Sequence, residues 1–346
     1  MRESLLTYTA KLLSENLPFL LLRKSGGAEV KIIHQESKKL YKKAHDTMSS
    51  AFFSKFLSSD NQFYIYGEVI KRFDWNFKPF KSEIATVKLS KDVRLAHEML
   101  VSDAVSTIQN TNLEKVVLSL KHPIQAKKTP LEILGNLLDK YSQANCYFFY
   151  HPAVGSWMGA TPETLLSYNS GLLKTMSLAG TKSAENDHEK PWGMKEQNEQ
   201  LLVTEYIAKA LQKVADSPPT IGPVKTVQAG SLLHLKTTLE VPLSYDKINQ
   251  AIKELHPTPA ICGLPRTAAQ DYIITHENYD RSFYTGYLGI QNPQDQTADY
   301  FVNLRCMELK NNYVDLYAGG GITGMSVPQD EVDEIENKLS TMASIV

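Results

Sequence analysis

Apolar positions recur along this chain with two different periods, and segments of both kinds occur from end to end. Short apolar or alternating runs, rich in branched and aromatic residues, predict strands. These runs lie at residues 19–23, 63–70, 115–120, 146–150, 164–168, 173–177, 232–239, 286–290, 299–309 and 312–318. Apolar residues three and four apart predict helices instead. This spacing occurs over residues 95–108, 131–144, 194–214, 245–255 and 329–345.

Two short polar turns connect neighbouring strand segments, at residues 168–171 and 310–312. Turns of this length join antiparallel strands. Strands and helices do not alternate strictly along the chain, as they would in a fold built on a parallel sheet. We therefore predict an α+β fold with large antiparallel sheets and helices packed on the outside.

The chain shows no internal repeat, low-complexity tract or heptad array that would divide it into separate units. Its 346 residues, 42% of them hydrophobic, suffice for one large domain. Residues 1–90 carry few distinctive motifs, and we interpret them as an N-terminal layer of the same domain. Residues 91–346 carry the candidate chemistry.

The charge balance narrows the possible partners. The net charge is −1 and the sequence pI is about 6.8, which argues against a general nucleic-acid binder or a basic membrane-surface patch. Cys146, Cys262 and Cys306 are widely spaced, which suggests a reducing compartment without a disulfide framework. The N-terminal segment lacks the features of a signal peptide, and its apolar run at residues 17–22 is too short to span a bilayer. We expect a cytoplasmic protein.

Two pairs of glutamates share a spacing that suits a metal ion. Glu331 and Glu334 lie three residues apart on one predicted helix, and Glu196 and Glu199 repeat this spacing on another. Residues three apart project from one face of a helix, so two acidic faces could meet across a pocket. Carboxylates of this kind suit Mg²⁺, which keeps positions for water and for an anionic substrate. The simpler alternative is that all four glutamates are solvated on helix surfaces.

Three consecutive glycines, residues 319–321, precede the last predicted helix. Ser326 and Gln329 have the spacing of a capping box, which predicts that this helix begins at Ser326. The glycines lack the Lys-Ser/Thr of a P-loop and the flanking pattern of a dinucleotide fingerprint. We therefore interpret them as the lining of a pocket and not as a nucleotide site.

Two further residues are candidates for proton transfer. Glu163 lies between a proline and a strand, where a half-buried carboxyl could have a raised pKa and act as a general acid. Lys115 lies at the start of an apolar strand, where a desolvated lysine becomes a usable base. Alternatively, Glu163 is a turn carboxylate in water and Lys115 extends into solvent.

Three other features could bind an anion or a ring. The small-residue turn at residues 177–181 could offer backbone N–H groups to a carboxylate, although an ordinary turn would have the same sequence. Arg305 is predicted inside a strand, where an uncompensated charge is costly, and this suggests an anionic partner. His234, in another predicted strand, has the simpler interpretation of a hydrogen-bonded core histidine.

Taken in order, these segments resemble the chorismate-utilising enzymes, a family that includes isochorismate synthase, salicylate synthase and the large subunits of anthranilate and aminodeoxychorismate synthase. The resemblance covers roughly seven-tenths of the chain, from about residue 95 to the C-terminus. The matching segments are EKVVLS, GATPETLL, SLAGT, KEQNEQLLV, LLHLKTT, LHPTPAICGLPR, YDRSFYTGYLG, FVNLRCMEL and YAGGGITGMSVPQDEVDEIENKL. Each is weak alone, but together and in this order they are a specific signal.

Within that family, the segment LHPTPAICGLPR is most similar to isochorismate synthase. Anthranilate and aminodeoxychorismate synthases tend to carry threonine where this chain has Ala260. They also tend to end the motif in Pro-Lys, where this chain has Pro265 and Arg266. The chain departs from the family's frequent residues at Leu120, Gln200 and Val332.

The resemblance implies an isomerase that converts chorismate to isochorismate. Water would add at C2 of the ring while the 4-hydroxyl leaves, so the reaction needs a base and an acid. In this scheme Lys115 would activate the water, and Glu163 would protonate the leaving hydroxyl.

The same resemblance assigns metal and substrate positions. Glu199 and Glu334 would ligate Mg²⁺ directly, with Glu196 and Glu331 nearby through waters. The ion would bind the ring carboxylate of chorismate. The substrate-binding positions would be Gly180, Thr181, His234, Ala260, Tyr284, Arg305, Gly319 and Gly321.

The resemblance also sets expectations for partners and leaves alternatives open. We expect a monomer that binds neither nucleic acid nor membrane and needs no glutaminase subunit. A salicylate synthase would go on to eliminate pyruvate, and an aminating synthase would need ammonia. A catalytically inactive chorismate-binding protein would not need Lys115, Glu163 and both glutamate pairs. Menaquinone, siderophore and salicylate pathways could each receive the isochorismate.

Overall fold

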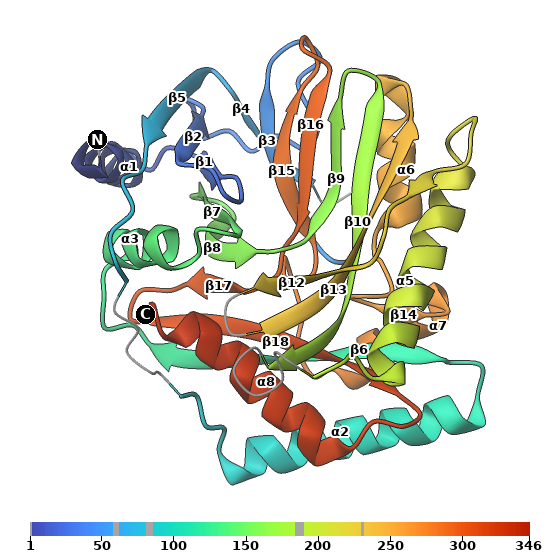
Figure 1. The fold of residues 1–346 in the computed structure, drawn as a ribbon. Coiled ribbons are helices and arrows are strands. Elements are labelled where there is room, and N and C mark those ends of the chain that lie inside the picture. Colours follow the sequence, from blue (N-terminus) through green and yellow to red (C-terminus); the bar gives the residue numbers. More distant parts are fainter. Residues whose placement is uncertain (1, 58–61, 81–85, 184–189, 230–231) are drawn as a thin grey trace.

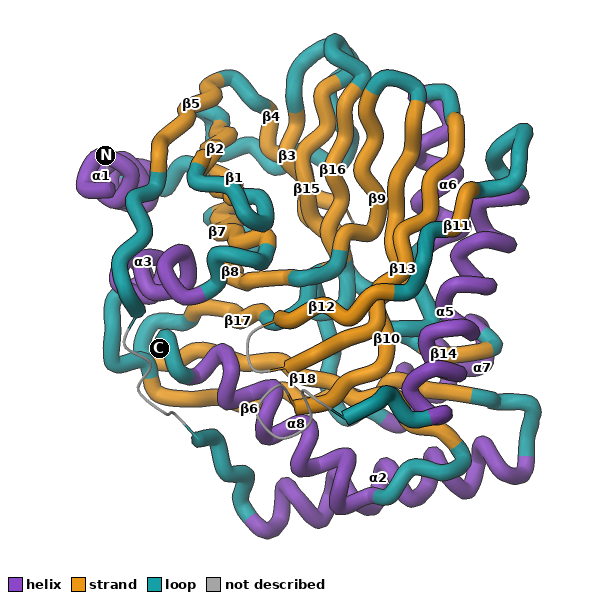
Figure 2. The backbone as a smooth tube through the Cα atoms, viewed as in Figure 1, coloured by secondary structure: helices purple, strands orange, loops and turns teal. Residues whose placement is uncertain are grey.

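The strands form two antiparallel sheets that pack face to face, with helices on the outer faces (Figure 1 and Figure 2). The computed structural model describes residues 2–57, 62–80, 86–183, 190–229 and 232–346. Within this part of the chain the predicted α+β class, with large antiparallel sheets and outer helices, is confirmed.

The first sheet has the strand order β14-β6-β18-β17-β8-β7-β1-β2-β5. Its strands are β1 (Phe19–Arg23), β2 (Glu29–His34), β5 (Val69–Asp74), β6 (Lys115–Gln125), β7 (Asn145–His151), β8 (Gly155–Thr161), β14 (Gly263–Leu264), β17 (Cys306–Leu309) and β18 (Tyr313–Thr323). The longest pairing in this sheet joins β6 to β18, whose residues face each other from Lys115–Thr323 to Gln125–Tyr313.

The second sheet has the order β11-β13-β10-β9-β16-β15-β3-β4, and β12 pairs with β13 beside β11. Its strands are β3 (Ser50–Ser54), β4 (Gln62–Tyr66), β9 (Thr164–Asn169), β10 (Leu172–Ser183), β11 (Thr220–Ile221), β12 (Lys225–Ala229), β13 (Leu232–Pro242), β15 (Tyr287–Asn292) and β16 (Thr297–Val302). Ser170 and Gly171 both have positive φ in the turn between β9 and β10, which confirms the hairpin predicted there.

Helices cover both outer faces through separate apolar clusters. The clusters place α1, α3 and α8 on the first sheet, α5 and α6 on the second, and α2 and α7 against β6. The helices are α1 (Arg2–Ser14), α2 (Lys91–Asn110), α3 (Pro130–Lys140), α5 (Met194–Gln212), α6 (Ile248–Leu255), α7 (Arg266–His276) and α8 (Pro328–Ala343), with a 3₁₀ turn at Tyr245–Lys247. Thr129 caps α3 in a capping box with Glu132.

The two sheets meet in an aromatic core. The rings of Phe53 and Phe283 stack at a centroid distance of 4.2 Å, and Trp157 stacks on Tyr317 at 5.2 Å. Successive side chains of a strand point to opposite faces of the sheet. A strand that is buried on both faces therefore contributes to a separate core on each side. In β1, for example, Leu20 and Leu22 lie in this core, whereas Leu21 packs under the outer helices.

Two segments predicted as single strands are each divided between the two sheets. The prediction at residues 63–70 was wrong because the chain crosses from β4 to β5 at Gly67, whose N–H donates to Ser49 O at 2.8 Å. The prediction at residues 299–309 was wrong because β16 and β17 are separated by a loop. Arg305 lies in this loop with φ 46, and therefore does not lie inside a strand.

The C-terminal motif also differs from the prediction. Strand β18 continues through all three glycines to Thr323. Helix α8 begins at Pro328 with Val327 as N-cap and without a side-chain cap, so the capping box expected at Ser326 and Gln329 does not form. Instead, Ser326 Oγ accepts from the backbone N–H of Thr323 at 3.1 Å and closes the turn.

Residues before α2 contribute strands to both sheets: β1, β2 and β5 to the first, and β3 and β4 to the second. Helices α1 and α7 were not predicted, because their apolar residues do not form a clear stripe. All three cysteines are buried and unpaired. Among the described residues, no helix is long and apolar enough to cross a membrane.

Candidate active site

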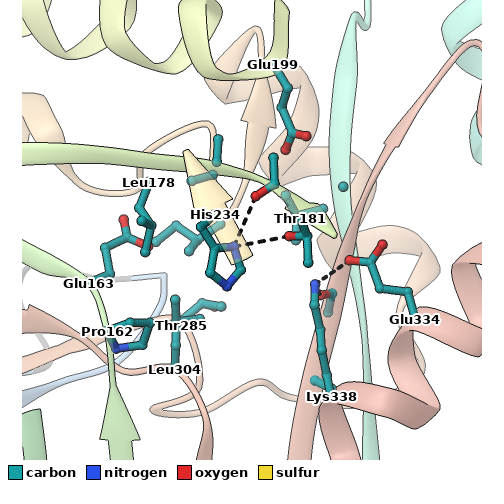
Figure 3. A pocket seen from close by; sticks show the side chains of 18 of the residues that line it. Pro162, Glu163, Leu178, Thr181, Glu199, His234, Thr285, Leu304, Glu334 and Lys338 are labelled. Carbon is teal, nitrogen blue, oxygen red and sulfur yellow. Dashed lines mark hydrogen bonds and ion pairs between the residues drawn. The ribbon is translucent and has the colours of Figure 1, made fainter. Parts of the chain in front are cut away.

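One pocket brings together nearly all of the candidate residues. Its walls include β10 and β13 of the second sheet, β18 of the first, and the N-terminal halves of α5 and α8 (Figure 3). The predicted residues that line it are Glu163, Gly180, Thr181, Glu196, Glu199, His234, Ala260, Tyr284, Arg305, Gly319, Gly321, Glu331 and Glu334. Lys115 lies just behind this lining and contacts it through Glu199.

Lys115 is the first residue of β6 and is 2% exposed, so the alternative of a solvated lysine does not hold. Its ammonium donates to Glu199 Oε1 at 2.8 Å. Gly321 on β18 makes room for this pair. A Cβ on Gly321 would lie 2.9 Å from Lys115 Cε and 3.4 Å from Glu199 Oε1. The glycines of β18 therefore let a lysine and a glutamate meet beside the strand.

Glu163 occupies the turn between β8 and β9 and is 3% exposed. Its backbone is fixed on both sides, because its N–H donates to Thr161 Oγ1 at 3.2 Å and its carbonyl accepts from Val302 N at 3.1 Å. Burial raises the pKa of the Glu163 carboxyl to about 8, although the charge of Lys115 opposes this shift. A carboxyl with this pKa keeps its proton at neutral pH and can act as an acid.

His234 on β13 connects Arg305 to Gly180 and Thr181. Its Nε2 lies 3.0 Å from Arg305 Nη2, and its Nδ1 lies 3.0 Å from Gly180 O and 3.3 Å from Thr181 Oγ1. Burial lowers the pKa of His234 to about 3, with Arg305 and Lys338 adding to the effect. The ring is therefore neutral. Because Arg305 can only donate, Nε2 accepts and the ring proton is on Nδ1.

The turn at Gly180 is a β-bulge in β10 with φ +67. Gln200, two turns into α5, compensates for the interrupted ladder. Its Oε1 accepts from Ala179 N at 3.0 Å, and its Nε2 donates to Ser177 Oγ at 2.8 Å and to Thr237 Oγ1 at 3.0 Å. Gln200 was noted in the sequence only as a departure from the family pattern. Its side chain joins the helix that carries Glu199 to the strand that carries Gly180.

The four glutamates of the expected metal site line one pocket from two helices, and three of them are ion-paired with lysines. Glu199 pairs with Lys115, Glu334 with Lys338 at 2.6 Å, and Glu331 with Lys195 at 3.6 Å. Within the described part of the chain, no three acidic, histidine or cysteine side chains converge on one point. Burial and the nearby Glu334 raise the pKa of Glu331. The four side chains offer only oxygen donors, and their negative charges are unfavourable so close together without a cation. Both properties suit a hard cation.

Lys338 and Lys195 line the same pocket and were not predicted from the sequence. Lys338 Nζ donates to Gly319 O at 2.7 Å as well as to Glu334, as Figure 3 shows for the glutamate. The only sequence signal was the spacing of four residues between Glu334 and Lys338, which is common on solvated helices.

The pocket also has an apolar lining, which contains Ala260. Its other apolar residues are Val117, Pro162, Leu178, Ala179, Ile261, Leu304, Tyr317 and Ala318. Pro265 and Arg266, the other residues of this motif, do not line the pocket. Arg266 Nη1 instead donates to the carbonyls of Lys253 at 3.1 Å and Glu254 at 3.2 Å at the end of α6.

A family model described as "Chorismate binding enzyme" matches residues 69–346. The chain belongs to this family. The resemblance expected from the motifs is thereby confirmed, and the match begins within the first 90 residues. Each of those motifs contributes at least one residue to the lining of the pocket described above.

Individual members of the chorismate-binding family that the chain is similar to include isochorismate synthases. The chain is 30% identical to the isochorismate synthase MenF of Escherichia coli over 71% of its own length and 59% of that protein. It is 32% identical to the salicylate biosynthesis isochorismate synthase of Pseudomonas aeruginosa over 73% of its length and 55% of that protein. The sequence matches thus span little more than half of either relative.

Solved structures share the fold across nearly the whole chain. The structure of E. coli MenF, the menaquinone-specific isochorismate synthase, superimposes with a TM-score of 0.82 at 20% identity, covering 96% of this chain and 89% of that one. Anthranilate synthase component I from Streptococcus pneumoniae superimposes with a TM-score of 0.72 at 17% identity, covering 94% and 89%. The fold is therefore common to the isomerising and aminating branches.

Proposed function

We propose that the chain is an isochorismate synthase, which converts chorismate to isochorismate with Mg²⁺ and needs neither ammonia nor a glutaminase subunit. The observation that carries the proposal is Glu163. It is a buried carboxyl that holds a proton at neutral pH, and it lines the same pocket as Glu199, the partner of Lys115. An acid and a base on one substrate are what an exchange of hydroxyl positions requires.

In the proposed reaction Lys115, once its ammonium has lost a proton, takes a proton from a water molecule as the water oxygen forms a bond to C2. The double-bond electrons of the ring shift, and the bond from C4 to its hydroxyl breaks. Glu163 gives its proton to that hydroxyl, which leaves as water. One water is consumed and one released, so the reaction is an isomerisation and is reversible.

The cationic groups of the pocket suit a dianionic substrate. Arg305 is held by His234, and Lys338 by Gly319 O, so both charges are positioned before a ligand arrives. Burial lowers the pKa of Arg305 to about 10, which still leaves the guanidinium charged at neutral pH. Gly180 and Tyr284 also line the pocket and could supply a backbone N–H and a hydroxyl as further donors.

We further propose that Glu199 and Glu334 hold Mg²⁺ directly, with Glu196 and Glu331 beside them through waters. The ion would supply positive charge for the ring carboxylate of chorismate. The four carboxylates fit this role by donor type and by the burial of Glu331, which is 4% exposed.

Ala260 supports water over ammonia as the nucleophile, since the aminating enzymes of the family tend to carry threonine there. The similarity to proteins named isochorismate synthases supports the same choice. We also propose that a single chain is active, so light scattering of the active protein should give a mass near 38.8 kDa.

One assay tests the proposal. The purified chain is incubated with chorismate and Mg²⁺, with and without ammonium, and the products are separated and identified. Isochorismate formed without ammonium is the expected result. Anthranilate or aminodeoxychorismate as the main product would refute it, and salicylate would identify a salicylate synthase. Chorismate that binds but is not converted would indicate a binding protein.

A further inference from the structure

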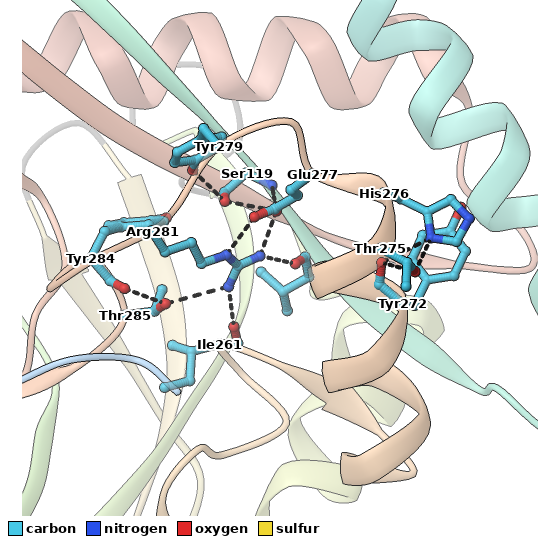
Figure 4. A network of polar contacts seen from close by, with 11 residues as sticks. Ser119, Ile261, Tyr272, Thr275, His276, Glu277, Tyr279, Arg281, Tyr284 and Thr285 are labelled. Atoms are coloured by element: carbon cyan, nitrogen blue, oxygen red, sulfur yellow. Dashed lines mark hydrogen bonds and ion pairs between the residues drawn. The ribbon is translucent and has the colours of Figure 1, made fainter. Parts of the chain in front are cut away.

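A buried polar network adjoins the lining of the pocket, and its centre is Arg281 (Figure 4). Arg281 follows α7 and is 3% exposed. It forms a two-pronged ion pair with Glu277, with Nε 2.7 Å from Oε2 and Nη2 2.6 Å from Oε1. Neither residue lines the pocket, and neither has a part in the proposed chemistry.

The remaining N–H groups of Arg281 all point to residues that do line the pocket. Nη2 donates to Val117 O at 2.6 Å, and Nη1 donates to Ile261 O at 3.1 Å and to Thr285 Oγ1 at 3.3 Å. Each of the guanidinium's five N–H donors therefore has an acceptor. One side chain thus joins a strand, the Ala260 loop and the segment after Tyr284.

The ion pair also takes the place of a missing strand along β6. Strand β14 pairs with β6 only at Lys115 and Val116. Beyond that point Arg281 donates to Val117 O, and Glu277 Oε1 accepts from the N–H of Ser119 at 2.7 Å and from its hydroxyl at 2.8 Å. Buried backbone groups need partners of this kind. The edge of β6, the strand that begins with Lys115, is consequently held at Val117 and Ser119 by the side chains of Arg281 and Glu277.

We propose that Arg281 is a positioning residue for the reaction, and this inference rests on the proposed function. It holds the carbonyls of Val117 and Ile261 at a set separation, and so fixes β6, which carries Lys115, against the loop that carries Ala260. Lysine cannot replace it, because an ammonium presents its donors from one atom and cannot reach Glu277 and three pocket-wall oxygens in different directions.

The test compares Arg281→Lys with Arg23→Lys. Arg23 is a matched control because it is also fully buried and also donates to backbone carbonyls, those of Tyr141 and Ala144, which do not line the pocket. For each variant we would measure the melting temperature, backbone hydrogen exchange, the Kd of chorismate by calorimetry, and kcat and KM.

The expected result for Arg281→Lys is faster exchange confined to residues 115–119, 260–264 and 284–286, with kcat/KM lower by about 10²-fold. Arg23→Lys should lower the melting temperature while leaving kcat, KM and exchange in those segments unchanged. The same kcat/KM in Arg281→Lys and the wild type, or exchange raised equally throughout both variants, would overturn the inference.

An unfolded variant and an inactive wild type would each be interpreted separately. If Arg281→Lys does not fold, Glu277→Gln is measured in its place, and it should show the same local exchange and a smaller loss of kcat/KM. If the wild type does not convert chorismate, the proposed function fails. The exchange pattern and the Kd of chorismate then decide whether Arg281 positions these pocket walls.

Discussion

The Lys115 ammonium lies 2.8 Å from Glu199 Oε1, so the proposed base is hydrogen-bonded to a proposed metal ligand. The two residues come from the start of β6 and from α5, 84 positions apart in the chain. Their side chains are 3% and 25% exposed. Because an ion pair this enclosed is disturbed by the loss of either partner, substitutions at Lys115 and at Glu199 have effects that are not independent.

Substitution of the proposed base should stop the reaction without unfolding the protein. We expect Lys115→Gln to lower kcat by about 10²- to 10⁴-fold, because the amide can still donate to Glu199 but cannot take a proton. The Kd of chorismate, measured by calorimetry, should change little. Lys174→Gln is the control, since Lys174 also lies on a strand with a glutamate, Glu240, at 2.9 Å. A kcat near the wild-type value in Lys115→Gln would remove Lys115 from the mechanism.

The pH dependence should show the titration of Glu163. Its protonated form is the proton donor and its pKa is about 8, so on the alkaline side kcat should be lost as the pH rises through this value. A kcat profile between about pH 6 and 10 in non-chelating buffers checks this prediction. A rate that stays constant up to the highest pH would show that another group supplies the proton.

The same carboxyl should make the protein less stable at high pH. The pKa of Glu163 is raised from 4.5 in the unfolded chain to about 8 in the folded one, so between these values the folded state binds more protons. The contribution of Glu163 to the free energy of unfolding therefore falls as the pH rises from 4.5 to about 8. Glu163→Gln, which cannot ionise, should be inactive yet gain melting temperature relative to the wild type, with a larger gain at pH 8 than at pH 5. An equal difference at both pH values would contradict the shift.

Substitutions can distinguish the proposed direct ligands of Mg²⁺ from the glutamates proposed to act through water. Activity should vanish with EDTA and return with Mg²⁺, because a pocket lined by four glutamates needs a cation when a dianion arrives. Glu199→Gln and Glu334→Gln should each lose more activity than Glu196→Gln or Glu331→Gln, and should need more Mg²⁺ for half-maximal rate. Full activity after complete chelation would rule out the metal.

Gln200 offers a test of the bulge at Gly180. Gln200→Ala would leave the N–H of Ala179 buried without its acceptor, which costs about 1–3 kcal/mol of stability. It should also raise KM for chorismate more than it lowers kcat, because the bulge binds the substrate and does not transfer protons. Denaturant unfolding and steady-state kinetics measure the two effects. If KM stays unchanged while stability falls, Gln200 has a structural role only.

The sequence predicted the fold class and selected residues that the structure brings into one pocket, but it missed parts of the surrounding fold. Glu163, His234 and Arg305 were found because unusual residue types occurred in segments whose order matched a known family, and all three line one pocket. The points at which the chain passes from one sheet to the other, at Gly67 and Arg305, were not predicted. A strand that changes sheets keeps its apolar pattern on both sides of the break, so periodicity alone cannot locate it.

Long-range polar contacts account for most of what was missed in the site. Glu277 and Arg281 have the spacing of an ordinary helical pair, yet Arg281 lies in a loop and contacts Val117, 164 positions earlier. Lys195 was not predicted as a pocket residue for the same reason, because its partner Glu331 is on another helix. Such contacts depend on the tertiary arrangement and leave no local pattern.

The placement of the N-terminal strands limits how far the chain can be shortened. A fragment beginning at residue 91 would keep every proposed catalytic group. It would also lose β1 from beside β7 and β3 from beside β15. Both sheets would then end in an apolar edge with unpaired N–H and C=O groups, which is a template for aggregation. The part of the chain needed to complete both sheets is therefore larger than the part that carries the proposed chemistry.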